Sequence, residues 1–116
     1  MQYMLMIQTA QDLLPEQGSQ EFNEMMAGYF AFTEEVKETG VFVAGDPLQG
    51  RETATTVRIR GGEKTVTDGP FAETKELLAG YYLLECETLD EALAYAEKIP
   101  GVKYGSVEIR PVMVID

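Results

Sequence analysis

The hydrophobic positions of this chain follow two kinds of spacing. Apolar runs rich in strand-compatible residue types predict β-strands over 2–8, 41–45, 77–86 and 105–115. The run LLAGYYLLEC at 77–86 is apolar at both odd and even positions. A strand with this pattern is typically buried on both faces of its sheet.

Two segments have helical spacing. From Ser19, a predicted N-cap, to Gly40, apolar residues recur every three or four positions, which predicts an amphipathic helix. Its predicted stripe is Phe22, Met25, Met26, Tyr29, Phe30, Thr33 and Val36. A second helix starts at Thr88-Leu89-Asp90-Glu91, a capping box in which each side chain satisfies the other residue's backbone N–H, and it ends at Pro100. Its predicted stripe is Leu89, Ala92, Leu93, Ala96 and Ile99.

Residues 54–67 predict a β-hairpin. Val57 and Ile59 alternate with Arg58 and Arg60, and two consecutive glycines then supply a tight turn. The apolar side chains therefore point to one face of the hairpin and the arginines to the other.

The predicted order is β-α-β, hairpin, β-α-β. This order indicates an α+β fold class, a ferredoxin-like split βαβ with an added hairpin, and we expect residues 1–116 to form a single domain. Two helices cover only one face of a four-stranded sheet, whereas the apolar runs need cover on both faces. We expect a second copy of the chain, packed sheet to sheet about a two-fold axis, as that cover.

The composition excludes several partners. With 9 Lys and Arg against 20 Asp and Glu, the net charge is −11, which repels nucleic acid and anionic membrane surfaces. We therefore expect no direct nucleic-acid or membrane partner. The beginning of the chain resembles neither a signal peptide nor a membrane span, so a cytoplasmic protein is expected.

The chain has no histidine and a single cysteine, Cys86. Serine–histidine and cysteine–histidine nucleophile pairs are therefore impossible, and thiolate zinc sites are excluded. The acidic residues also lack the spacing of a calcium loop. We expect no metal and no cofactor, and we interpret Cys86 as a buried strand residue.

Most of the positive charge is local to the hairpin and the segment after it: Arg51, Arg58, Arg60, Lys64 and Lys75. One interpretation is a solvated hairpin. The other is an anion site in which the Arg58 guanidinium holds a carboxylate by paired hydrogen bonds. Arg110 is a second candidate for that role, with an ion pair to Glu108 or to another chain as the alternative.

Asp68-Gly69-Pro70-Phe71 is the most distinctive tetrapeptide. As a turn, it needs no function: Asp accepts backbone hydrogen bonds, Gly permits a positive φ, Pro fixes the next φ and Phe fills the core. The alternative is that Asp68 presents a functional carboxylate at the mouth of a cavity.

A longer pattern carries a resemblance. The run TVTDGPFAETKELLAGYYLLECETLDEALAYAEKIPG, with the early YMLMI and the closing GSVEIRPV, resembles the DGPF branch of the YCII-related family over nearly the whole chain. This resemblance implies a dimeric α/β-barrel of ferredoxin-like protomers, similar in fold to muconolactone isomerases. Some members carry a His-Asp pair in a pocket proposed as catalytic. This chain lacks the histidine, and Asp46 in AGDPL is the implied counterpart of the acid.

Two functions are predicted. The first is binding of an anionic small molecule, with isomerase- or lyase-like proton transfer, in a pocket between the sheet and a partner chain. Its predicted residues are Asp46 or Asp68 as base, Arg58 and Arg110 as anion clamp, Tyr81 as hydroxyl donor and Lys75 as a further ligand-binding cation. An exposed Asp is a weak base at neutral pH, so catalysis requires burial that raises its pKa.

The second function is that of a non-enzymatic regulatory protein. DGPF proteins are often associated with extracytoplasmic-function sigma factors, so the resemblance implies such a sigma factor as a partner. A cofactor-free monooxygenase of the same barrel type is the weakest candidate, because the chain has neither the Trp nor the His that such sites commonly use.

Overall fold

The computed structural model of this protein describes residues 1–69 and 75–115. The strands are β1 (Gln2–Ala10), β2 (Phe42–Pro47), β3 (Thr55–Arg60), β4 (Glu63–Asp68), β5 (Glu76–Glu85) and β6 (Gly105–Pro111). The helices are α1 (Gln20–Glu38) and α2 (Leu89–Ala96), and the short 3-10 helices are η1 (Gln11–Leu13), η2 (Arg51–Thr53) and η3 (Pro100–Tyr104).

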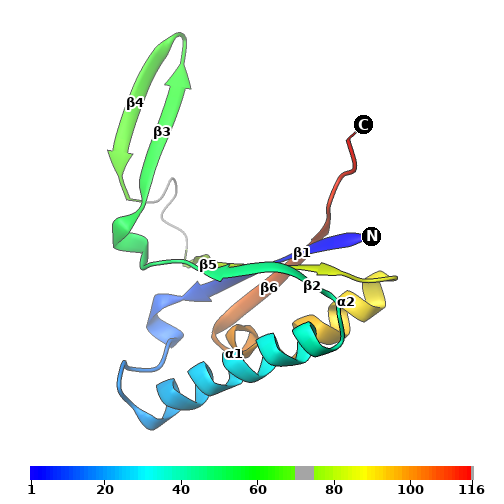
Figure 1. Ribbon diagram of the computed structural model, residues 1–116. Coiled ribbons are helices and arrows are strands. Elements are labelled where there is room, and N and C mark those ends of the chain that lie inside the picture. The colour runs from blue at the N-terminus through cyan, green and yellow to red at the C-terminus, as the bar shows by residue number, and fades with distance from the viewer. Residues whose placement is uncertain (70–74, 116) are drawn as a thin grey trace.

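Four strands form an antiparallel sheet in the order β2-β5-β1-β6, and both helices lie on one face of it (Figure 1). This order is that of the ferredoxin-like split βαβ unit, so the predicted α+β fold class is confirmed. Strands β3 and β4 form a separate hairpin that stands off the opposite side of the sheet (Figure 1).

Local capping explains where the helices begin and end. The Ser19 hydroxyl accepts a hydrogen bond from the Phe22 N–H at 3.1 Å, and Gly40 follows α1 with φ +79°. At α2 the Thr88 hydroxyl accepts from the Glu91 N–H at 3.2 Å. The Glu91 carboxylate, however, accepts from the N–H of Glu87 rather than from that of Thr88, one residue earlier than the capping box predicts.

The core fills the space between the helices and the sheet. Alternate residues of β1 and β5 point into it, and α1, α2 and the segment after α2 cover them. The fully or nearly fully buried side chains include Tyr3, Leu5, Ile7, Phe32, Val36, Tyr82, Leu84, Ala92, Ala96 and Ile99. The rings of Phe32 and Tyr82 meet edge to face, with their centroids 4.9 Å apart.

The predicted apolar stripe of α1 is partly wrong. Phe32 and Val36 are its buried residues, whereas Phe30 is 70% exposed and Met26 is also exposed. The reason is geometric: α1 carries a wider band of apolar residues than a single contact with the sheet can bury, and Phe32 lies on the centre of that contact. The predicted stripe of α2 also includes two exposed residues, Leu89 and Leu93.

Two strand predictions have different outcomes. The hairpin is confirmed, with Gly61 and Gly62 at φ +58° and +81° in its turn. The last strand ends at Pro111 rather than at 115. Its final bond to the sheet runs from the Val112 N–H to the Gln2 carbonyl at 2.8 Å, and β1 begins at Gln2, so β1 offers no further partner for the residues after 112.

The sheet face opposite the helices is open in the protomer. Met4, Met6, Tyr81 and Leu83 lie there, and each is only partly buried. The radius of gyration is 16.0 Å, compared with about 13 Å expected for a compact domain of this length. The hairpin and the C-terminal segment, which both extend beyond the open face, account for this excess (Figure 1).

Replacing a core leucine should cost much more stability than replacing an exposed one. We expect Leu84→Ala to lower the free energy of unfolding by about 3 kcal/mol, because Leu84 is fully buried. The matched variant Leu93→Ala, on the outer side of α2, should cost less than about 1 kcal/mol. Urea unfolding at one fixed protein concentration measures both, and equal losses would contradict this description of the core.

Candidate functional site

Two predicted site residues meet at the β2 edge of the sheet. Asp46 of β2 and Tyr81 of β5 are cross-strand partners, so their side chains leave the sheet on the same face. The Tyr81 hydroxyl donates a hydrogen bond to Asp46 Oδ2 at 2.7 Å. Both residues are predicted site residues, and the register of β2 on β5 brings them into contact.

This hydrogen bond fixes the protonation of the phenol. It raises the pKa of Tyr81 above its ordinary value, because an ionised phenol loses the bond and faces the Asp46 carboxylate. At neutral pH Tyr81 is therefore a proton donor held against an acceptor. The second carboxylate oxygen, Asp46 Oδ1, has no hydrogen bond to any of the described residues.

Asp46 and Tyr81 also border a cleft of about 480 Å³, although their side chains leave the sheet on the open face, opposite α1. The cleft lies between α1 and the β2 edge of the sheet, and its walls are mainly apolar and aromatic. The lining residues include Ile7, Leu14, Met25, Met26, Tyr29, Phe30, Thr33, Leu48, Tyr82, Asp46 and Tyr81. Small-molecule sites in proteins commonly have volumes of about 300 to 1,000 Å³ and walls of this kind.

Glycine at position 45 keeps the cleft narrow at β2. A Cβ atom there would lie 2.7 Å from the Tyr82 ring, too close for any larger residue without a shift. Gly45 pairs with Tyr82 across the two strands, next to the Asp46–Tyr81 pair. The glycine therefore lets the Tyr82 ring lie directly against the edge strand.

A short polar chain crosses the cleft. The Thr33 hydroxyl donates to the Tyr29 carbonyl at 2.9 Å, and the Tyr82 hydroxyl lies 2.7 Å from the Thr33 oxygen, to which it donates. Burial raises the pKa of Tyr29 to about 12 and also raises the pKa of Tyr82. Both phenols are therefore neutral at physiological pH.

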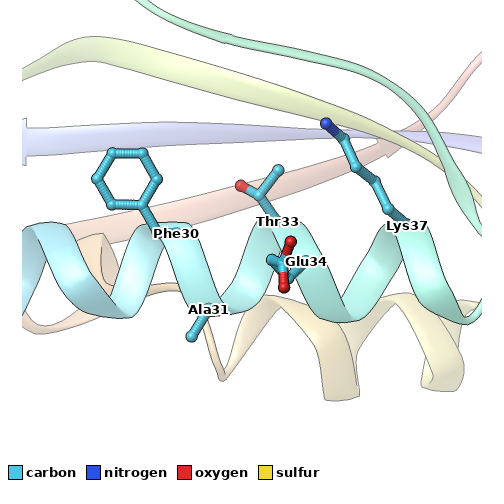
Figure 2. A pocket seen from close by; sticks show the side chains of 5 residues that line it. All are labelled: Phe30, Ala31, Thr33, Glu34 and Lys37. Carbon is cyan, nitrogen blue, oxygen red and sulfur yellow. The ribbon is translucent and has the colours of Figure 1, made fainter.

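A second hollow, of about 460 Å³, lies along α1 and is lined by Phe30, Ala31, Thr33, Glu34 and Lys37 (Figure 2). Phe30, Thr33 and Lys37 rise from one side of the helix and Ala31 points the other way (Figure 2). Phe30 and Thr33 also line the cleft, so the two hollows share a wall. Only the cleft borders the Asp46–Tyr81 pair, and we place the candidate site at that pair.

The hairpin carries two other predicted residues away from this pair. Asp68 ends β4 and is exposed, and Arg58 is half-buried on the hairpin face opposite Val57. Gly69 has φ +101°, as a turn after Asp68 requires. The rest of the predicted turn, Pro70-Phe71, lies outside the described residues.

Arg110 lies on the open face, but at the opposite edge of the sheet. Three strand spacings of about 4.8 Å separate β6 from β2, or about 14 Å. The Arg110 Nε lies 3.7 Å from Glu108 Oε2, which is the ion pair considered as the alternative to a ligand role. Lys75 pairs loosely with Asp12, with 3.9 Å between Nζ and Oδ2.

The part of the chain that the structure describes contains no group of three or more His, Cys, Asp or Glu side chains placed to hold a metal ion. Cys86 is buried, and burial raises the pKa of its thiol. None of the helices in residues 1–69 and 75–115 combines the length and the apolar character needed to cross a membrane.

The residues of the cleft interior are not predicted as site residues from the sequence. Helical spacing places Tyr29 and Thr33 in the predicted stripe of α1, and Tyr82 lies in a predicted strand. The sequence signal for these cleft residues is the width of the apolar band on α1. Met26 and Phe30 belong to that band, but the sheet leaves both of them exposed. An apolar side chain left at the edge of a core often marks a groove.

The chain belongs to the YCII-related domain family, whose family model matches residues 1–116. An uncharacterised protein of Rhizobium meliloti (strain 1021), R00369, is 52% identical over 60 residues, which are 50% of this chain and 48% of that protein. The matched region thus spans about half the length of this curated relative.

A solved structure of similar fold is the 5-chloro-2-hydroxyhydroquinone dehydrochlorinase TftG of Burkholderia phenoliruptrix AC1100, in complex with 2,5-dihydroxybenzoquinone. The TM-score is 0.55 at 17% identity, over 97% of this chain and 94% of that one. This likeness supports the α+β fold.

Replacing Asp46 should change the ionisation of its neighbour. We expect Asp46→Asn to lower the pKa of Tyr81 toward its ordinary value, because the amide carries no charge and is a weaker acceptor for the phenol proton. A pH titration of the tyrosine Cζ resonances by ¹³C NMR measures this change. Tyr82, whose pKa is raised by burial, is the internal control, and an unchanged Tyr81 titration would contradict the hydrogen bond.

Proposed function

We propose that this protein is a dimeric small-molecule-binding protein, a single domain over residues 1–116, whose ligand carries a hydroxyl group. The observation that carries the proposal is the hydrogen bond between Tyr81 and Asp46 beside a cleft with apolar walls. The remaining lone pairs of Asp46 accept a hydrogen bond from a ligand on the open face of the sheet, where the half-buried apolar side chains of Met4, Met6 and Leu83 are available to its hydrocarbon part.

The same pair supports isomerase- or lyase-like proton transfer. Asp46 is the acceptor of a ligand proton, and Tyr81 stabilises the carboxylate and keeps it oriented. In the protomer Asp46 is exposed and its carboxylate is solvated. A second copy that covers the open face would remove water from this carboxylate and strengthen it as a base.

The acidic side chain of Asp46 limits the chemical class of ligand that the pair can bind. An anionic group placed directly on Asp46 is repelled, and Arg110 lies at the opposite edge of the sheet from this pair. An anionic ligand is therefore part of the proposal only if its charged end lies away from Asp46. TftG, of similar fold, was solved with a dihydroxylated quinone, which agrees with a hydroxylated ring as the class to test.

The regulatory alternative, an extracytoplasmic-function sigma factor as partner, stays a prediction of the resemblance to DGPF proteins. The cytoplasmic location likewise stays a prediction from the sequence.

Ligand binding should depend on the pair. In isothermal titration with hydroxylated aromatic probes, including 2,5-dihydroxybenzoquinone, we expect Asp46→Asn to weaken binding about tenfold, the usual effect of losing one hydrogen bond to a charged group. Tyr81→Phe should weaken binding less, because Tyr81 only orients that carboxylate. Tyr95→Phe is the control, since its hydroxyl contacts Thr39 at the far end of α1. Wild-type affinity in both site variants would contradict the proposed site.

The dimer has its own test. Leu83 lies on the open face next to Met4, and a charge there should prevent a second sheet from packing. We expect the wild-type protein to sediment as a dimer at micromolar concentration and Leu83→Glu as a folded monomer. Ala94→Glu, on an exposed position of α2, should leave the dimer intact. A monomeric wild-type protein would refute the dimer, and with it the covered Asp46.

A further inference from the structure

The cleft between α1 and the β2 edge contains a phenol whose proton has no acceptor among the residues that the structure describes. The Tyr29 hydroxyl oxygen accepts a hydrogen bond from the Gly101 N–H, and none of the described residues accepts the proton of this hydroxyl. A Cβ atom at Gly101 would lie 2.6 Å from the hydroxyl oxygen and 2.5 Å from Ile7 Cγ2, so the hydroxyl lies beside Ile7. Ile7 and Thr9 are buried and line the cleft, which places the Tyr29 hydroxyl at its inner end.

A second phenol of the cleft offers an acceptor instead of a donor. The Tyr82 hydroxyl donates its proton to Thr33, because the Thr33 proton goes to the Tyr29 carbonyl. The lone pairs of the Tyr82 oxygen therefore remain available, and Tyr82 lines the same cleft. The cleft thus presents a hydrogen-bond donor at Tyr29 and an acceptor at Tyr82.

The walls of the cleft favour a neutral ligand. None of the described residues that line it is Lys or Arg, and its acid, Asp46, projects from the opposite face of the sheet. A charged ligand group in this cleft would lose hydration without gaining a partner. Met25 and Met26 can adapt to the shape of a hydrocarbon ring, and Phe30 rises from the same side of α1 as Thr33 (Figure 2).

We propose that this cleft binds a neutral ring compound that carries a carbonyl group, and that the carbonyl oxygen accepts the Tyr29 hydroxyl proton. A carbonyl is the matching group, because it accepts a hydrogen bond and brings no proton of its own that needs an acceptor. A ligand N–H or O–H at another position of the ring donates to the Tyr82 oxygen. The site goes beyond the proposed function, since the side chains of Asp46 and Tyr81 lie on the other face of the sheet.

Two probes that differ only in a carbonyl group provide a matched test. Tetralone is a neutral bicyclic ketone, and tetralin is the same ring system with a methylene group in place of the carbonyl. We expect Tyr29→Phe to weaken tetralone binding about fivefold and tetralin binding less than about twofold, because only tetralone loses a hydrogen bond. Tyr95→Phe should change neither, since its hydroxyl contacts Thr39 at the far end of α1. Isothermal titration measures the dissociation constants, and circular dichroism verifies that each variant is folded.

The position of the bound probe can be measured without any substitution. In ¹³C NMR of the wild-type protein, tetralone should shift the Cζ resonances of Tyr29 and Tyr82 and leave that of Tyr95 unchanged. A wild-type protein that does not bind tetralone overturns the inference. A Tyr29→Phe variant that keeps wild-type affinity for tetralone, or that loses affinity equally for both probes, also overturns it.

The same spectra separate this inference from the proposed function. A tetralone-induced shift at Tyr81 without one at Tyr29 would place the probe on the open face, which refutes the cleft site and leaves the proposed function intact. Conversely, wild-type affinity of Asp46→Asn for 2,5-dihydroxybenzoquinone would contradict the proposed function and leave the cleft site standing.

Discussion

A four-stranded sheet that is apolar on both faces, with helices for only one of them, is the constraint from which the rest of this structure follows. In β5 the even positions Tyr82 and Leu84 enter the core under α1 and α2, while the odd positions Tyr81 and Leu83 face outward. The side chains of Met4 and Met6 continue the outward face on β1. Hydrophobic burial is the main driving force of folding. An apolar face of this kind therefore favours packing against another surface over exposure to water.

The features of the molecule that exceed a minimal ferredoxin-like fold lie on that open side. Asp46 and Tyr81 project there from the β2 edge, and the hairpin and the C-terminal segment extend beyond it (Figure 1). A polar pair beside an apolar surface is stable while it is solvated, and it becomes reactive when a covering surface removes that water. In the proposed dimer, the open face would connect the assembly of the two copies to the chemistry of this pair.

The sequence predicted those features that depend on neighbours along the chain. Ser19, Thr88 and the glycines at 61 and 62 act within three or four residues of their own positions, so the helix starts and the hairpin turn were predictable. The end of β6 was not, because it depends on where β1 begins, a hundred residues earlier. The choice of Phe32 over Phe30 for the core depends on the angle at which α1 crosses the sheet, which periodicity alone does not specify.

The site was predictable as separate residues and not as a pair. Asp46 and Tyr81 were each named, but their contact requires the register of β2 on β5, which includes an irregularity between Phe42 and Ala44. A slip of one residue would place either side chain on the opposite face. Arg58 and Asp68 illustrate the converse, since they lie close to the cleft residues in sequence while the hairpin carries them away from it.

A tyrosine–aspartate pair behaves differently from the His-Asp pair that the family resemblance implies for other members. Imidazole changes charge near neutral pH, so a His-Asp pair alternates between donor and acceptor in the physiological range. Here the pKa of Tyr81 is raised by Asp46, which keeps the phenol protonated at neutral pH. The Tyr81 phenol therefore stays a hydrogen-bond donor into mildly alkaline solution. Any proton that the pair accepts must go to Asp46, and removal of water from this carboxylate by a second copy would favour that proton transfer.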